Sequence, residues 1–227
     1  MVDLDGVAPV TRQPGWDLPV RLFHWSIVVL VAFSWWSAEE RLLDWHRRSG
    51  YAVLALILFR LAWGVCGSHA ARFSSFVRGP GTVARYIRRD LFSRTAPVAV
   101  GHNPIGGWSV LAMLAALLVQ TLLGLFAVDI DGIESGPLSS WVDFETGRLA
   151  SQAHGILLNI ILALIGLHVL AILFYLAILF YLLRKRANLV RPMLFASTPV
   201  TRVTLARSAG LLLLCSAAVW ALVTFGG

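Results

Sequence analysis

The stretch from Ala153 to Leu183 constrains the fold of this 227-residue chain more than any other, because it contains neither a charge nor a proline. As an α-helix its 31 residues would extend about 46 Å, which exceeds the roughly 30 Å hydrocarbon core of a bilayer. His154 and His168 lie in it fourteen residues apart. That spacing is about 3.9 turns, so both side chains leave the same face about 21 Å apart. The stretch predicts a transmembrane helix that could hold two metal centres at two depths.

Composition extends this prediction to the whole chain. Hydrophobic residues make up 58% of it and charged residues 14%, whereas a soluble domain has roughly a quarter charged residues. The apolar runs are too long for buried strands, and helices satisfy their own backbone hydrogen bonds in lipid. The net charge of +7 is typical of arginine-rich cytoplasmic loops, so we do not expect nucleic-acid binding. The chain is predicted to be an all-α integral membrane protein.

The apolar runs and the charged loops predict the topology. A four-helix domain covers residues 21–186, with spans at about 22–37, 47–66, 109–128 and 153–183, after an N-terminal tail at 1–20. Residues 187–227 supply a linker and a fifth span at about 208–225. The loops at 72–103 and 184–207 are basic, whereas those at 38–45 and 129–151 are acidic or mixed. Since positive loops stay inside, the N-terminus and the linker are expected in the cytoplasm and the acidic loops in the periplasm.

Four histidines pair by depth under this topology. His46 and His154 come near the periplasmic surface, and His24 and His168 come near the cytoplasmic one. Two imidazoles from two helices suit the axial positions of a low-spin b haem. With both axial positions filled, such a site transfers electrons and does not bind oxygen. The four histidines are therefore predicted as the iron ligands of two b haems.

Other residues are candidates for contact with these haems. Arg60 follows His46 by fourteen residues on the same helix face, and a charge inside a membrane needs a partner such as a propionate of the inner haem. Glycines in the spans let flat macrocycles approach a helix backbone, or let helices pack closely. Gly50 and Gly124 are the candidates for contact with haem. Glycines also occur at positions 64, 155 and 166.

Several motifs resemble the bacterial cytochrome b561 family, which includes the cytochrome b subunits of nickel–iron hydrogenases. They are RLFHWS, WHRRSGYAVLALILFRLAWG, ARFSSFVRGP, GHNPIGGWSV and HGILLNIILALIGLH, and the resemblance covers about residues 16–193. It implies a four-helix core in the bacterial inner membrane, with two b haems on residues matching His24, His46, His154 and His168. Members pass electrons between a periplasmic partner and the quinone pool.

We therefore expect an electron-transfer subunit of the oxidoreductase class in a respiratory chain. Its partners would be membrane lipid, quinone, a periplasmic c-type cytochrome or other redox protein, and a possible second copy in a homodimer. Acidic periplasmic loops would attract a basic partner. Quinone is expected at the inner haem, with Arg21, Arg72 and His102 as candidate contacts, because basic groups stabilise developing negative charge.

Two other functions compete with this prediction. The first is a stand-alone superoxide:quinone oxidoreductase, which needs no protein partner. The second is a divalent-metal transporter whose histidines line a path. Transporters of that kind add carboxylates inside the membrane, and no Asp or Glu lies within a predicted span, which argues against the second function.

Overall fold

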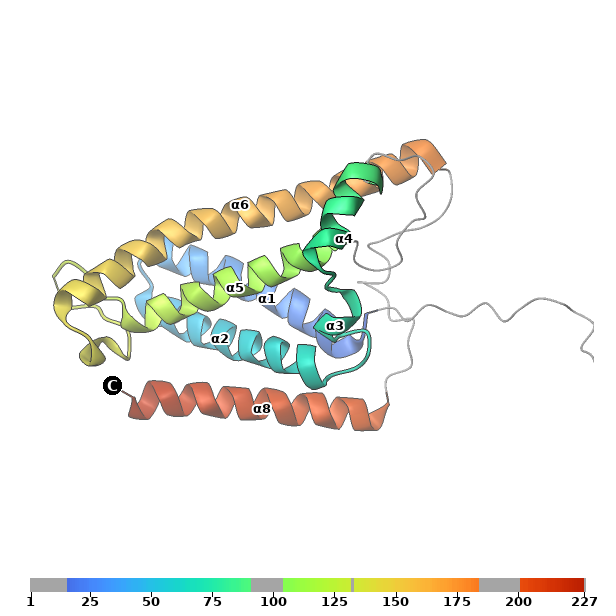
Figure 1. Cartoon of the computed structure of the whole chain (residues 1–227). Coiled ribbons are helices and arrows are strands. Elements are labelled where there is room, and N and C mark those ends of the chain that lie inside the picture. The colour runs from blue at the N-terminus through green and yellow to red at the C-terminus, as the bar shows by residue number, and fades with distance from the viewer. Residues whose placement is uncertain (1–15, 91–103, 132, 184–200, 227) are drawn as a thin grey trace, which may run out of the picture.

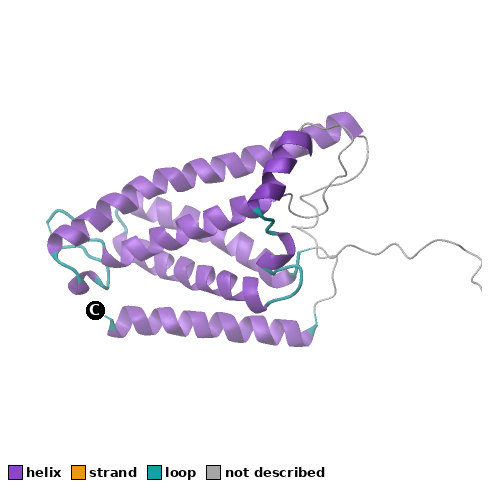
Figure 2. Ribbon diagram, viewed as in Figure 1, coloured by secondary structure: helices purple, strands orange, loops and turns teal. Residues whose placement is uncertain are grey.

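The protein is described here by a computed structural model that covers residues 16–90, 104–131, 133–183 and 201–226. Over these residues it is helical, and the only strand-like pairing described is a single bridge between Val128 and Ser135. Figure 2 shows helices joined by loops in the described part. The predicted all-α fold is confirmed. The first fifteen residues of the predicted tail and most of the linker lie outside the described residues.

Among the described residues, five helices are long and apolar enough to cross a membrane. They are α1 (Leu18–Glu39), α2 (Leu43–Cys66), α5 (Pro104–Phe126), α6 (Phe144–Leu183) and α8 (Arg202–Phe225). Figure 1 shows them running side by side, with α6 along one edge and α8 along the other. Many leucines on their outer faces are exposed, such as Leu213 and Leu214 at 71% and 69%. Lipid covers such faces in a membrane, and the fifth span of the predicted fold is confirmed.

The helices begin earlier than the apolar runs that predicted them. Asp17 caps α1, since its Oδ1 accepts a hydrogen bond of 2.9 Å from the backbone N–H of Val20. Asp143 stands before α6 and accepts one of 2.7 Å from the N–H of Thr146, which lowers the pKa of the Asp143 carboxyl. Hydropathy locates the part of a helix that lies in lipid, whereas capping side chains decide where the helix starts.

α2 is the central helix of the bundle. It packs against α1, α5 and α8, and α5 in turn packs against α6. Half of the membrane-crossing part of α2 is buried, against 6% for α6. Ile57 and Trp63 of α2 are 0% and 2% exposed at the centre of the larger hydrophobic cluster. A smaller cluster joins Leu54 of α2 to Val219 of α8, which fixes the fifth helix on the flank of α2.

The two ends of the bundle differ in charge, and we name them by it. At the acidic end lies the acidic loop (residues 127–143), whose carboxylates include Asp129, Asp131 and Glu134. Arg47 of α2 fixes this loop by an ion pair of 2.5 Å to Glu134, and it also pairs at 2.7 Å with Asp44, one turn earlier on α2. The acidic loop is thus tied to the residue that follows His46.

The basic end lies at the other side of the bundle. Three short segments follow α2 there: α3 (Phe73–Phe76), α4 (Pro80–Arg85) and a π-helical turn (Tyr86–Asp90). The arginines of this segment are exposed, and they are Arg72, Arg78, Arg85, Arg88 and Arg89. Trp108 of α5 anchors the segment by donating its indole N–H to the Arg78 carbonyl at 2.8 Å. Lys and Arg beside an apolar bundle are typical of contact with anionic lipid headgroups.

Candidate functional site

His46 and His154 face each other between α2 and α6 at the acidic end. Their ring centroids are 6.0 Å apart, and the ring planes are inclined at 85°. A metal held by one nitrogen of each imidazole sits about 2.0–2.1 Å from each nitrogen. Adding the distance from nitrogen to ring centre gives a centroid spacing of about 6 Å. The observed spacing is therefore close to that of two imidazoles that share one metal ion.

The outer nitrogen of each ring is held by a backbone carbonyl. Nδ1 of His46 is 2.8 Å from the carbonyl oxygen of Ser34, and Nδ1 of His154 is 2.9 Å from that of Gln120. Because a carbonyl only accepts, each Nδ1 carries the proton and donates it. The lone pair then lies on Nε2. This hydrogen bond orients the ring and makes Nε2 a better metal ligand.

A cavity of about 200 Å³ surrounds this histidine pair. Both predicted glycines line it, together with Arg47 and Glu39. A Cβ added at Gly50 would meet nothing within 4 Å, so this position opens onto free space beside α2. A Cβ at Gly124 would lie 3.2 Å from Cε1 of His154, tighter than an ordinary contact. Gly50 therefore leaves room for a flat group, whereas Gly124 lets the His154 ring approach α5.

His24 of α1 and His168 of α6 lie towards the basic end, where the sequence predicts the second pair. The two rings are close enough to interact electrostatically. Nδ1 of His24 is buried and has no hydrogen-bond partner among the described residues. An unpaired buried nitrogen is costly, and a metal ion or a hydrogen-bonding group bound at Nδ1 itself would remove that cost.

Two of the three buried polar atoms that lack a partner in the described part of the chain belong to residues of the candidate sites, and the third belongs to Arg60, on the helix that carries His46. The three atoms are His24 Nδ1, Arg60 Nη1 and Gln120 Oε1. Gln120 lines the cavity at His46 and His154, and Arg60 follows His46 by fourteen residues towards the other pair. Native proteins pair nearly all of their buried polar atoms. The concentration of the exceptions here fits sites built around a group that the chain itself does not supply.

Arg60 is only 2% exposed, so its charge is enclosed by the bundle. Its guanidinium lies over the Phe73 ring, 4.7 Å from the ring centre, and it interacts electrostatically with Asp17. Asp17 Oδ2 accepts hydrogen bonds from Trp63 Nε1 at 3.0 Å and Ser68 Oγ at 2.5 Å. The sequence reasoning missed Asp17, although an Asp two residues before the Pro of a first helical turn is a capping signal.

The candidate quinone contacts are not gathered into one site by the described residues. Arg72 donates from Nε to the Gly67 carbonyl at 3.1 Å, next to the end of α2, and it is exposed. Arg21 is half-buried, one turn before His24 on α1. His102 lies outside the described residues.

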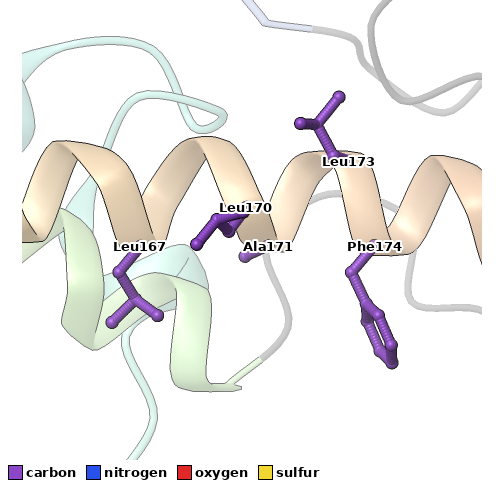
Figure 3. Close-up of a pocket in the computed structure, with 5 residues that line it drawn as sticks. All are labelled: Leu167, Leu170, Ala171, Leu173 and Phe174. Atoms are coloured by element: carbon purple, nitrogen blue, oxygen red, sulfur yellow. The ribbon is translucent and has the colours of Figure 1, made fainter.

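An open apolar hollow lies beside the second half of α6. Figure 3 shows its lining, which comes from this one helix and carries no polar side-chain atom: Leu167, Leu170, Ala171, Leu173 and Phe174. A quinone headgroup needs hydrogen-bonding groups, which this lining lacks. Leu167 and Leu170 are 65% and 63% exposed, as expected of a face covered by lipid tails.

The histidines of the candidate sites come in twos and not in larger clusters, and His69, which is also described, belongs to neither site. No group of three or more His, Cys, Asp or Glu side chains that could hold a metal ion occurs in the described part of the chain. Protein sites for a bare divalent ion such as zinc take three or four protein ligands. A haem brings four ring nitrogens of its own and needs only one or two axial ligands, so pairs of histidines fit haem better than a bare ion.

Comparison with known proteins agrees with this chemistry. The sequence model of a family described as prokaryotic cytochrome b561 matches residues 15–195. No curated protein and no solved structure matches the chain significantly. The matched region contains all four paired histidines and α1 to α6, whereas α8 lies beyond it.

Proposed function

Because the chain belongs to the prokaryotic cytochrome b561 family, we propose that it carries electrons between a periplasmic redox protein and the membrane quinone pool. The family and the five apolar helices make it a multi-pass membrane protein, a b-type cytochrome of electron transfer. A bound b haem supplies a one-electron iron couple. The observation that carries the proposal is the His46–His154 pair, with both Nδ1 atoms held by carbonyls and both rings facing one cavity.

The proposal assigns two haems to two histidine pairs. His46 and His154 would hold one at the acidic end, and His24 and His168 the other towards the basic end. The fourteen-residue spacing on α6 supports two centres about 21 Å apart along that helix. The unpaired Nδ1 of His24 and the unpaired Nη1 of Arg60 support a second bound group near the basic end.

Loop charge supports the orientation that we propose. The exposed arginines between α2 and α5 belong in the cytoplasm by the positive-inside rule, and the acidic loop then faces the periplasm of a bacterial inner membrane. Quinone would exchange electrons at the cytoplasmic side, near His24 and Arg21. The redox partner would dock at the acidic end.

The first test is the haem content of the detergent-purified protein. We expect about two b haems per chain by pyridine haemochrome, with low-spin bands in the reduced-minus-oxidised spectrum, because each of two histidine pairs fills both axial positions. One haem per chain would show that one of the two pairs is assigned wrongly. A folded protein without haem would contradict the proposed function altogether.

The acidic loop supports a docking surface for a basic partner such as a small c-type cytochrome. Ile130 and Ile133 are 76% and 81% exposed, and Asp129, Asp131 and Glu134 surround them. An apolar centre with a charged rim is the usual composition of a transient protein interface. The ion pair from Glu134 to Arg47 joins this surface to the cavity that His46 lines.

Neutralising this rim should slow electron transfer to a basic monohaem cytochrome c, used as the probe. We expect Asp129→Asn with Asp131→Asn to lower the second-order rate constant about tenfold at low ionic strength, because charge steers association. The measurement is stopped-flow oxidation of the reduced protein across a salt series. Reduction of the same variant by dithionite, which needs no docking, is the control. A wild-type rate that is independent of salt and unchanged in the variant would contradict this docking surface.

A further inference from the structure

We propose that the hydroxyl of Ser37 raises the redox potential of the haem at His46 and His154, because it shares the carbonyl that holds His46. The inference rests on the proposed function for the presence of that haem. It concerns a positioning residue that does not contact the iron and acts through His46.

The geometry places two donors on one acceptor. The Ser34 carbonyl oxygen lies 2.8 Å from Nδ1 of His46 and 3.0 Å from Oγ of Ser37. Both atoms donate, since a carbonyl oxygen offers only lone pairs. Ser37 is 0% exposed, so no water competes for its hydroxyl. Ser37 lies in the last turn of α1, three residues after Ser34, which is the spacing at which serine bonds back to its own helix.

The opposite ligand lacks this arrangement. Nδ1 of His154 donates to the Gln120 carbonyl at 2.9 Å, and no other side chain of the described residues donates to that oxygen. The amide oxygen of Gln120 itself is buried without a partner. The two axial imidazoles therefore have unequal hydrogen bonds. At His46 the Ser37 hydroxyl shares the acceptor of the ring, and the Ser34 hydroxyl lies 3.2 Å from Nδ1 as a longer second contact that the Ser37 variants leave in place.

The sign of the effect follows from the charge on the imidazole. A strong Nδ1–H···O=C bond gives the ring more negative character and makes Nε2 a stronger donor to iron. Stronger donation favours the ferric state and lowers the potential. A carbonyl that already accepts a hydroxyl proton is a weaker acceptor for His46. Ser37 thereby reduces the donor strength of His46 and favours the reduced state.

Ser37→Ala tests this directly. We expect the midpoint potential of the acidic-end haem to fall by up to about 59 mV, which corresponds to a tenfold change in the one-electron reduction equilibrium. Ser37→Thr keeps the hydroxyl and should retain the wild-type potential. Ser37→Cys carries a weaker donor and should give an intermediate fall, which provides a second measurement where the alanine variant fails to fold. The readouts are an optical redox titration and the g-values of the ferric low-spin signal.

Ser49→Ala is the matched control. Ser49 is 4% exposed and donates to the backbone carbonyl of His46 at 2.9 Å, so it contacts the same ligand residue without contacting the acceptor of its ring. We expect no shift. An unchanged or raised potential in Ser37→Ala, or an equal fall of the potential in Ser49→Ala, would overturn the inference. The proposed function would remain intact in that case, provided that the wild-type protein holds two haems. Absence of the acidic-end haem from the wild type would instead defeat the proposed function.

Discussion

His154→Ala should reduce the haem content from about two b haems per chain to about one. The variant removes one of two axial imidazoles whose ring centroids are 6.0 Å apart, and it releases the Nδ1 hydrogen bond to the Gln120 carbonyl. A five-coordinate haem left on His46 alone would be high-spin and weakly held. Pyridine haemochrome counts the loss, and the visible spectrum distinguishes a lost haem from a retained high-spin one.

Asn159→Ala is a matched control for this variant. Asn159 is an exposed polar residue on the same helix, and its amide donates to the Gly155 carbonyl at 3.2 Å. It should retain two low-spin haems. His168→Ala should also leave one haem per chain, but here the acidic-end haem remains and the basic-end haem is lost. Because quinone is proposed to react at the basic-end haem, oxidation of quinol should stop in His168→Ala and continue in His154→Ala. Two low-spin haems in His154→Ala would contradict the ligand assignment at the acidic end.

The sequence predicted the helices and the pairing of the histidines because both depend on regular geometry. Fourteen residues bring two side chains to one helix face whatever surrounds them, so the spacing of His154 and His168 is enough to assign them to two depths. Loop charge then assigned His46 and His24 to the same two depths. The proximity of His46 to His154 follows from these two regularities.

The hydrogen bonds that hold the ligands could not be predicted in this way. Backbone carbonyls of Ser34 and Gln120 hold the rings, and every residue type offers a carbonyl. Only the packing of α1 and α5 against the histidine helices decides which carbonyl is used. Gln120 did offer a signal that was missed, since a polar side chain in an apolar span is seldom without a function.

Helix ends were the other part that hydropathy located poorly. The α6 helix begins at Phe144, nine residues before the charge-free stretch, because Asp143 caps it outside the apolar segment. Asp17 extends α1 in the same way and also binds Trp63 and Ser68 at the end of α2. These contacts fix the start of α1 beside the end of α2.

The second large effect is expected at Arg60. Asp17 is the one carboxylate described as interacting with this buried charge, and Asp17 already accepts hydrogen bonds from Val20, Trp63 and Ser68. Nη1 of Arg60 therefore remains unpaired at 2% exposure, a state that an anionic group such as a haem propionate would relieve. The proposal that Arg60 serves the basic-end haem makes its charge part of that haem's environment.

Arg60→Leu should lower the midpoint potential of the basic-end haem by about 59 mV, which corresponds to a tenfold change in the one-electron reduction equilibrium. A positive charge beside a haem favours its reduced form, and leucine removes the charge while keeping an apolar side chain in the bundle. The haem should also dissociate faster in the variant. Redox titration and transfer of haem to apomyoglobin measure the two effects.

Two variants separate charge from packing. Arg60→Lys keeps a positive charge and should recover most of the potential, although it loses the planar guanidinium over Phe73. Arg207 of α8 is exposed, and its Nη2 donates to the carbonyl of Cys66, the last residue of α2, at 3.1 Å. Arg207→Gln removes this positive charge and should shift the potential of neither haem. If Arg60 served only to pair with Asp17, leucine would change the melting temperature and leave both potentials unmoved. A fall confined to one haem is therefore the result that separates a haem contact from a structural ion pair.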